Sequence, residues 1–469
     1  MTHRIGILFC LAIVFLSVCS NVYGFEEPKY TNVIIIYADD LGWGDLACFG
    51  HPEFKTPNID RLAAEGARLT NFYSTYPYCA PARASLQTGR YAIRTGVVRN
   101  PCPDAGQNDI GIPASEITLG EAFKAAGYRT ICIGKWHLGH RTEFFPIRNG
   151  YDEYLGILYS NDMHPVELID GDKVVEYPVV QATLTKRYTE RALDFIERNK
   201  NRPFFIYFPH AMPHKPLAAS ERFYKKTGTG LYGDVITEID WSVGRIIDRL
   251  KILGLDEQTL VFFTSDNGPW YGGSTGGLRG MKGRTWEGGI RVPLIARWPG
   301  KIPPGHVSRQ PAVIVDLYTT ALNAAGIDEP KDRIIDGKNI MPLLTSKAQT
   351  PHEAIFSYAG DRLRTVRSGK WKLHLKSPGP KKEKVWKSDD KWADRRAPDG
   401  VRIIAPFEQA HPSQYPGVMT GDVFAKIGLF DLEGDPAEQH DLAEQNPDIV
   451  EKLKAMAEKF MESTKPAAE

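Results

Sequence analysis

The sequence has few cysteines, no long basic tract and no long apolar run in its interior. Six cysteines among 469 residues are too few for a disulfide scaffold. A formal net charge of +1 without a basic tract argues against nucleic acid as a partner. Past the N-terminus no segment is long and apolar enough to span a bilayer, so no stable membrane span is expected. The hydrophobic content of 42% is that of a globular protein with a sizeable core.

The first 24 residues have the pattern of an export signal. Arg4 gives a cationic start, Ile5–Val18 is apolar, and Val22-Tyr23-Gly24 offers a cleavage site. The apolar run is short for a spanning helix. The chain contains no Asn-x-Ser/Thr sequence, which favours bacterial export over a eukaryotic secretory route. We therefore expect an exported bacterial protein, either periplasmic or extracellular.

Apolar strands alternate with helices through the first part of the chain. Continuous runs of β-branched and aromatic residues are typical of parallel strands buried on both faces. Such runs occur at Asn32–Tyr37, Arg129–Ile133, Pro203–Phe208 and Thr259–Thr264. Helices are expected at Pro57–Glu65, from Pro81 to near Gly89, at Ile117–Ala126, at Tyr188–Asn199 and from near Asp234 onward. This order predicts an α/β fold with a mostly parallel central sheet flanked by helices.

Each of these strands runs directly into a polar cluster. The carboxyl ends of parallel strands meet at one edge of a sheet, which is where sites form in such folds. We therefore expect side chains that are far apart in the sequence to converge there. The clusters are Asp39 with Asp40, Lys135 with His137, His210 with His214, and Asp266 with Asn267.

The acidic clusters predict a metal site. Asp39, Asp40, Asp266 and Asn267 supply three carboxylates and an amide oxygen, which suit Ca²⁺ or Mg²⁺ better than Zn²⁺. A turn or a helix cap would explain either pair alone. Two pairs that each close a buried strand favour a metal, because converging carboxylates repel one another without a cation.

Cys79 begins a segment with distinctive spacing, Cys-x-Pro-x-Arg-x-x-x-x-Thr-Gly. Pro81 suits a first helical turn and Gly89 suits a helix end. Cys79 is then expected at a helix N-terminus, where an anion is favoured, with Arg83 one turn further along. The alternative is a small buried thiol before an ordinary helix. The number of fixed positions favours a functional site.

Three cations, Arg83, Lys135 and Lys282, are expected near the same edge. Lysines are usually solvated, but Lys282 lies in the Gly-rich stretch 272–289, where backbone can approach a ligand closely. Three fixed cations and a metal describe a pocket for a tetrahedral oxyanion. The acid–base candidates are His137 and His214, with His140 and His210 as second choices.

The sequence pattern changes near residue 350. Ile355–Tyr358, Leu363–Arg367 and Trp371–Leu375 are short runs separated by turns, which is typical of an antiparallel sheet. Ser377–Val423 is rich in charged residues and proline and is expected to be a long loop or insertion. A strand near Phe430 and an amphipathic helix at Ile449–Met461 follow. We predict a catalytic domain at 25–350 and a smaller C-terminal α+β subdomain at 351–469.

Together these motifs resemble those of the formylglycine-dependent sulfatases, in the arylsulfatase A and N-acetylgalactosamine-6-sulfatase branch of the alkaline-phosphatase-like superfamily. The matching segments are Ala38–Asp45, the Cys79 segment, Gly134–Gly139, His214–Pro216, Thr264–Gly268 and Gly280–Pro293. Ser160 falls where that branch places a sulfate-contacting serine. Ala82 is a departure, since many members have Ser there.

The resemblance implies that a formylglycine-generating maturation enzyme oxidises Cys79 to an aldehyde. It also implies one Ca²⁺, held by residue 79 and the four residues Asp39, Asp40, Asp266 and Asn267. If Cys79 is converted, the cysteines outside the signal leave at most one disulfide among Cys48, Cys102 and Cys132.

The implied reaction is hydrolysis of a sulfate monoester. One hydroxyl of the hydrated aldehyde attacks sulfur, with Asp266 as the proton acceptor. The metal, Lys135 and Lys282 hold the sulfate oxygens, and His214 or Lys282 protonates the departing alcohol. His137 then takes a proton from the second hydroxyl, and release of sulfate restores the aldehyde.

The implied substrate is a small sulfated saccharide of the 6-sulfated galactose or N-acetylgalactosamine type, or more broadly an aryl sulfate. The loops expected to recognise the sugar are Asn100–Asn108, Asn161–Glu167 and Ser377–Val423. A phosphodiesterase or phosphonate hydrolase of the same superfamily stays open, although the sequence lacks the extra Asp/His set of two-metal phosphatases. A non-catalytic Ca²⁺-dependent glycan-binding protein with unmodified Cys79 is a further alternative.

Overall fold

The computed structural model of the protein describes residues 30–163, 166–378, 386–390 and 409–465. The expected export signal at 1–24 lies outside the described residues. So do 379–385 and 391–408, which belong to the expected loop Ser377–Val423. Within the described ranges, none of the helices has the length and apolarity needed to cross a membrane.

The four apolar runs form the centre of a large sheet. In spatial order they are β8 (Thr259–Ser265), β1 (Asn32–Ala38), β7 (Phe204–Pro209) and β3 (Arg129–Lys135), and all of them run parallel. Nearly every residue of these strands is buried, as expected for strands covered on both faces. The predicted α/β fold with a mostly parallel centre is confirmed.

The flanks of the sheet are mixed in direction. Of its eleven strands, β9 runs antiparallel to both of its neighbours, and β5 runs antiparallel to β4 and β6. The remaining strands are β2 (Ala67–Tyr73), β4 (Glu153–Ile157), β5 (Leu168–Asp170), β6 (Lys173–Glu176), β9 (Arg291–Arg297), β10 (His306–Ser308) and β11 (Ala312–Val313).

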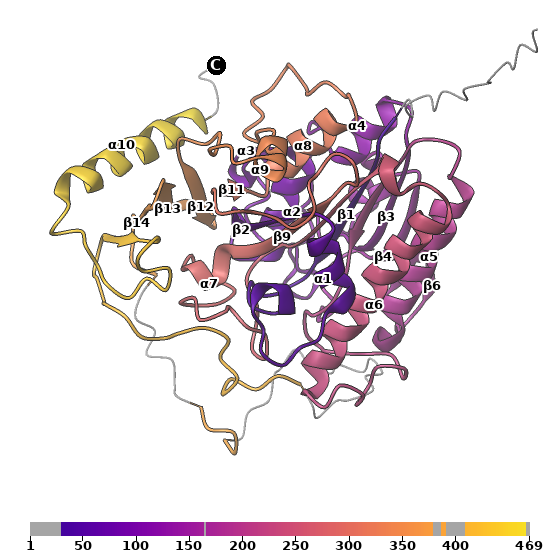
Figure 1. Cartoon of the computed structure of the whole chain (residues 1–469), viewed down its shortest axis with the longest axis horizontal. Coiled ribbons are helices and arrows are strands. Elements are labelled where there is room, and N and C mark those ends of the chain that lie inside the picture. Colours follow the sequence, from indigo (N-terminus) through magenta and orange to yellow (C-terminus); the bar gives the residue numbers. More distant parts are fainter. Residues whose placement is uncertain (1–29, 164–165, 379–385, 391–408, 466–469) are drawn as a thin grey trace, which may run out of the picture.

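Helices cover both faces of this sheet (Figure 1). Successive residues of β1 point to opposite sides, so Ile35 and Tyr37 join one apolar core and Ile34 and Ile36 join the other. The first core is covered by α2 (Cys79–Thr88), α3 (Ala92–Thr95), α4 (Leu119–Ala125), α8 (Asp316–Ala324) and α9 (Met341–Thr345). The second is covered by α1 (Pro57–Ala64), α5 (Leu184–Arg198) and α6 (Gly230–Ile252). Short 3₁₀ turns lie at Ala47–Phe49, Pro103–Ala105, Thr142–Phe144, Pro146–Arg148, Gln181–Thr183 and Asp256–Gln258.

Helix α2 begins at Cys79 and is buried along its whole length. Gly89 ends it in the left-handed conformation, with φ of 67° and its N–H bonded to the carbonyl of Ser85 at 3.0 Å. Glycine adopts this conformation without strain, which is why the helix stops where the sequence predicted. Cys79 therefore lies buried at the start of a helix that is covered on all sides.

A separate antiparallel sheet forms the C-terminal part, as predicted. Its strands are β12 (Ile355–Ala359), β13 (Arg362–Ser368), β14 (Trp371–His374) and β15 (Gly428–Asp431). The closing helix α10 (Pro447–Ser463) packs on β13, and the short helix α7 (Glu287–Ile290) lies where this sheet meets the large one (Figure 1). The division of the chain at residue 350 stays a prediction. Cys48, Cys79, Cys102 and Cys132 are all free thiols.

Candidate active site

Adjacent strand ends bring the two acidic pairs together. Asp39 and Asp40 follow β1, Asp266 and Asn267 follow β8, and the register pairs Ala38 with Ser265. The backbone N–H of Asp40 donates to Oδ1 of Asp266 at 3.1 Å. One oxygen from each of the three aspartates lies within 4.8 Å of the others, and all three side chains are buried. The convergence expected from the sequence is present.

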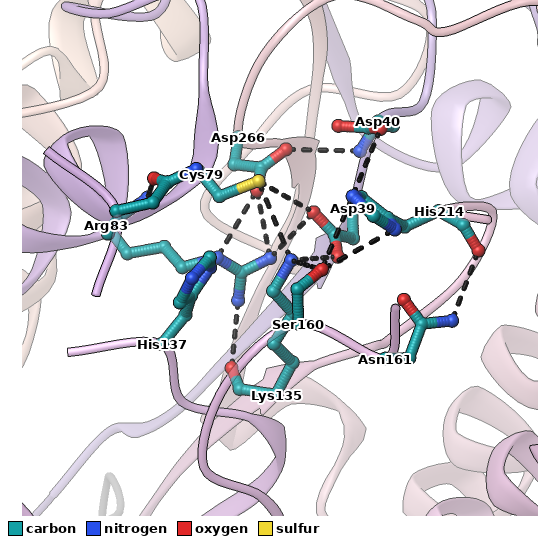
Figure 2. Close-up of polar contacts among 12 residues, drawn as sticks. Asp39, Asp40, Cys79, Arg83, Lys135, His137, Ser160, Asn161, His214 and Asp266 are labelled. Carbon is teal, nitrogen blue, oxygen red and sulfur yellow. Dashed lines mark hydrogen bonds and ion pairs between the residues drawn. The ribbon is translucent and has the colours of Figure 1, made fainter. Parts of the chain in front are cut away.

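Cys79 lies at the same place, at the first turn of α2 (Figure 2). Its Sγ atom is 3.5 Å from Oδ1 of Asp39 and 3.5 Å from Nζ of Lys135. The next backbone N–H, that of Ala80, is capped by Oδ1 of Asn100 at 2.9 Å. This cap was not foreseen, because nothing in the sequence pairs residue 100 with a helix that starts 21 residues earlier. It anchors the loop 100–108 to the helix that carries Cys79.

Each aspartate is paired with a cation. Arg83 donates to Oδ2 of Asp266 at 2.9 Å and lies 3.3 Å from Oδ1 of Asp39. Nζ of Lys135 is 2.5 Å from Oδ2 of Asp39, and Nζ of Lys282 is 2.7 Å from Oδ2 of Asp40. The cluster therefore sets three carboxylates against three cations, and of these six side chains only that of Lys282 is partly exposed.

The pKa values of the two inner carboxyls move in opposite directions. Burial by itself raises the pKa of Asp39, but Lys135, His214 and Arg83 together hold it well below its usual range. Burial, followed by the charge of Asp39, raises the pKa of Asp266. Of the two carboxyls, Asp266 is therefore the one that takes up a proton more readily.

Ser160 and His214 close another side of the cluster (Figure 2). Nζ of Lys135 donates to Oγ of Ser160 at 3.1 Å, and Nε2 of His214 lies 3.3 Å from the same oxygen. Nε2 of His214 is also 3.7 Å from Oδ2 of Asp40. Burial, then the positive charge of Lys282, holds the pKa of His214 well below its usual range.

His137 lies beside Arg83 at the edge of the cluster (Figure 2). Its Nε2 atom donates to the carbonyl of Pro101 at 3.3 Å, and its buried Nδ1 atom has no partner among the described residues. Burial and the neighbouring Lys135 and Arg83 hold its pKa well below its usual range. A neutral ring with a free Nδ1 lone pair can accept a proton.

His140 and His210, the second-choice acid–base candidates, lie outside the contacts described above. His140 contacts Asn108 at 2.8 Å, and the ring of His210 packs at a tilt of 43° against that of Phe208, with ring centroids 4.4 Å apart. Neither ring nitrogen of His210 has a hydrogen-bond partner in the part of the chain that the structure describes. By contrast, the contacts above join Asp39, Asp40, Cys79, Arg83, Lys135, Ser160, His214, Asp266 and Lys282 into one cluster.

The donor set fits a hard divalent cation. Asn267 donates from Nδ2 to Oδ1 of Asp40 at 2.8 Å, which leaves its Oδ1 buried and without a partner among the described residues. A buried acceptor without a donor is costly unless a cation satisfies it. Three carboxylates and this amide oxygen form an all-oxygen set of the kind that Ca²⁺ and Mg²⁺ prefer.

Comparisons with known proteins identify the family. Residues 31–327 match the sulfatase family model, and 350–469 match the model of the C-terminal region of aryl-sulfatase. The N-acetylgalactosamine-6-sulfatase of Homo sapiens is 42% identical over 381 residues, covering 74% of this chain and 72% of that protein. Human arylsulfatase A is 34% identical over 474 residues, covering 92% of this chain and 88% of that protein.

Solved structures show the same fold. One from work on the metabolism of multiple glycosaminoglycans by Bacteroides thetaiotaomicron superposes with a TM-score of 0.75 at 25% identity, covering 92% of this chain and 99% of that one. A phosphonate monoester hydrolase from Silicibacter pomeroyi shares the fold with a TM-score of 0.61 at 18% identity, covering 92% and 95%. The chain belongs to the sulfatase family and is a sulfuric ester hydrolase.

Proposed function

We propose that the protein releases sulfate from a sulfated saccharide, of the 6-sulfated galactose or N-acetylgalactosamine type. The observation that carries the proposal is the position of Cys79, whose sulfur lies 3.5 Å from both Lys135 and Asp39 inside the balanced charge cluster. The identity to N-acetylgalactosamine-6-sulfatases supports the choice of sugar. We further propose that the chain is exported and that residues 25–350 form the catalytic unit.

We propose that Asp39, Asp40, Asp266, Asn267 and residue 79 hold one Ca²⁺. The unpartnered Oδ1 of Asn267 supports this choice, because it is a hard neutral donor next to three carboxylates. When bound, Ca²⁺ would supply positive charge to sulfate oxygens next to residue 79.

We propose that Cys79 is converted to formylglycine by a maturation enzyme. When hydrated, this aldehyde supplies one hydroxyl for attack on sulfur and a second for its own regeneration. The surroundings of Cys79 fit two hydroxyls, because Lys135 offers a donor and Asp39 an acceptor, each at 3.5 Å from the sulfur position.

The chain's own cations orient the sulfate in this proposal. Lys135 and Lys282 bind sulfate oxygens, and Ser160 is held 3.1 Å from Nζ of Lys135 to donate to the same group. Arg83 stays with Asp266 and Asp39 and keeps these carboxylates aimed at residue 79. Preorganised charges of this kind stabilise a transition state without reorganisation.

Proton transfers fall to residues on either side of residue 79. Asp266 accepts a proton on one side, and the free Nδ1 of His137 accepts one later. The departing alcohol needs a proton from His214 or Lys282, which both lie against Oδ2 of Asp40. In the structure Lys282 is the charged member of this pair, because Asp40 and its neighbours outweigh burial and raise the pKa of Lys282.

Three measurements on one preparation and a fourth on a variant test the proposal. The mass of the peptide containing residue 79 reports conversion, and elemental analysis of the converted enzyme should give one calcium per chain. Activity should be highest on 6-sulfated N-acetylgalactosamine or galactose, compared with 4-sulfated and N-sulfated monosaccharides and with 4-nitrophenyl sulfate. Comparable rates on all of these would show a broad arylsulfatase, and activity on phosphate esters alone would refute the proposal. Cys79→Ala should abolish turnover while preserving the fold.

A further inference from the structure

A second set of potential ligands surrounds Cys79, and it differs in chemistry from the oxygen-only set. One potential ligand atom each from Asp39, Cys79 and His214 lies within 4.8 Å of the others, and all three side chains are buried. This set offers an oxygen, a sulfur and a nitrogen. Thiolate and imidazole ligands favour zinc over calcium, which takes oxygen ligands almost exclusively.

The sulfur and the carboxylate oxygen have the spacing of two ligands on one zinc ion. Sγ of Cys79 lies 3.5 Å from Oδ1 of Asp39. Zinc–sulfur and zinc–oxygen bonds of about 2.3 and about 2.0 Å at a tetrahedral angle place the two ligand atoms about 3.5 Å apart. Oδ2 of Asp39 faces Lys135, so this ion pair is kept when Oδ1 binds a metal. Arg83, which lies 3.3 Å from Oδ1, keeps its shorter pairing with Asp266.

His214 is already oriented as a metal ligand. Its Nδ1 atom lies 2.5 Å from the carbonyl oxygen of Lys215. A carbonyl only accepts, so Nδ1 carries the hydrogen and the lone pair of the neutral ring is on Nε2. Metal-binding histidines commonly have this arrangement, in which one ring N–H is bonded to a carbonyl and the other nitrogen binds the metal. Nε2 faces the cluster, 3.3 Å from Oγ of Ser160.

We propose that chains in which residue 79 remains a cysteine bind one zinc ion through Asp39, Cys79 and His214. Binding replaces the S–H bond of Cys79 by a sulfur–zinc bond, and the thiol proton leaves to solvent. The zinc site shares Asp39 with the proposed calcium site but does not use Asn267. Loss of the sulfur on conversion therefore switches the metal preference of the pocket from zinc to calcium.

The test uses the full chain produced without a maturation enzyme, with residue 79 shown to be cysteine by peptide mass. The protein is incubated with zinc chloride, freed of excess metal by gel filtration and analysed for zinc. We expect one zinc per chain, and none in Cys79→Ser, which lacks the soft donor. Cys102→Ser is the matched control, because Cys102 is a free, partly exposed thiol that belongs to neither of the ligand sets found among the described residues. It should retain the zinc.

Two further variants separate the zinc site from the calcium site. Loss of a residue that only hydrogen-bonds to a metal ligand lowers metal affinity about 10- to 100-fold. His214→Ala removes a ligand itself and should lower zinc affinity by more than this. Asn267→Ala should bind zinc as the wild type does. Melting temperatures establish that each variant is folded before its metal content is compared.

Cobalt provides a readout that does not depend on affinity. Co²⁺ in place of zinc should give thiolate-to-metal charge-transfer absorption in the wild type and in Cys102→Ser, but not in Cys79→Ser. Zinc retained by Cys79→Ser, zinc lost from Asn267→Ala, or cobalt without the thiolate band would each overturn the inference. None of these results depends on sulfatase activity, so the zinc site and the proposed function can fail separately.

Discussion

Nζ of Lys372 lies 2.9 Å from Oε1 of Glu287, and neither side chain is more than 1% exposed. Lys372 belongs to β14 of the small sheet, whereas Glu287 begins α7, at the end of the Gly-rich stretch that carries Lys282. The same nitrogen is 3.0 Å from Oε1 of Glu438. One buried cation thus joins carboxylates from the two parts of the molecule, close to the segment that positions a proposed active-site lysine.

Replacing Lys372 by Met should therefore destabilise the protein strongly. The two carboxylates would stay buried without their shared cation, which costs about 3–5 kcal/mol. Lys370→Met is the matched control, because Lys370 pairs with Asp431 while its side chain is 44% exposed. Such exposed pairs contribute about 0–1 kcal/mol. Urea unfolding measures the loss in free energy of unfolding for each variant. Equal losses would show that the buried cluster stabilises the fold no more than an exposed ion pair does.

The same cluster predicts a loss of stability in acid. Burial by itself raises the pKa of Glu438, but Lys372 and His374 hold it below its ordinary value of 4.5. A carboxyl whose folded pKa is depressed adds stability that is complete above its unfolded pKa and is lost as the pH falls through the folded value. The free energy of unfolding should thus decline as the pH is lowered from about 5.

Glu438→Gln should make this acid-side decline shallower. Glu433→Gln, at an exposed position of the same region, should leave the slope unchanged. His374 also lowers the free energy of unfolding as the pH falls, but at a higher pH than Glu438. Burial lowers the pKa of His374 from its ordinary value of 6.5, so the folded state resists its protonation. Chemical unfolding at a series of pH values gives the slopes, and parallel curves for wild type and Glu438→Gln would contradict the prediction.

Calcium should stabilise the converted protein through Asn267. A ligand that binds only the folded state at 100 times its Kd adds about 2.7 kcal/mol. Asn267→Ala removes the unpartnered Oδ1 and should reduce the rise in melting temperature with calcium, whereas Asn201→Ala at an exposed position should not. An unchanged calcium response in Asn267→Ala would remove this residue from the proposed ligand set.

The centre of the fold could be predicted from sequence because its strands are continuous apolar runs. β1 and β8 are buried on both faces, and their next residues are the aspartates of the site. β2 and β9 were missed for physical reasons: β2 alternates polar and apolar residues, and β9 contains Pro293 directly after a Gly-rich stretch. Both are held in the sheet mainly by pairing with distant strands.

Parts of the site could not be foreseen, because they depend on single contacts between distant segments. The cap of Ala80 by Asn100 is one example. Another is the guanidinium of Arg83, which lies over the ring of Tyr37 at 5.3 Å from the ring centroid. The segment 409–418 is a third, because it belongs to a stretch with no periodic pattern. In the structure it runs alongside loops of the active site.

Segment 409–418 contacts the loops that carry His214 and Lys282. The side-chain amide of Gln409 pairs with both the N–H and the carbonyl of Leu217, at 2.6 and 2.9 Å, three residues after His214. Further along, the carbonyl of Val418 accepts from the N–H of Gly280 at 3.1 Å, two residues before Lys282. The C-terminal region thereby connects the two candidate proton donors for the departing alcohol.

Gly417→Ala should loosen this connection, because a Cβ at residue 417 would lie 2.2 Å from the carbonyl oxygen of Gly280. Gly434→Ala is the matched control, since a Cβ there meets nothing within 4 Å. A sugar alkoxide leaves poorly without a proton, whereas nitrophenolate does not need one. Gly417→Ala should therefore lower kcat about 10- to 100-fold on N-acetylgalactosamine-6-sulfate and much less on 4-nitrophenyl sulfate.

Hydrogen exchange should rise at 272–282 in Gly417→Ala but not in Gly434→Ala. Equal losses on both substrates with unchanged exchange would show that the segment does not position these groups.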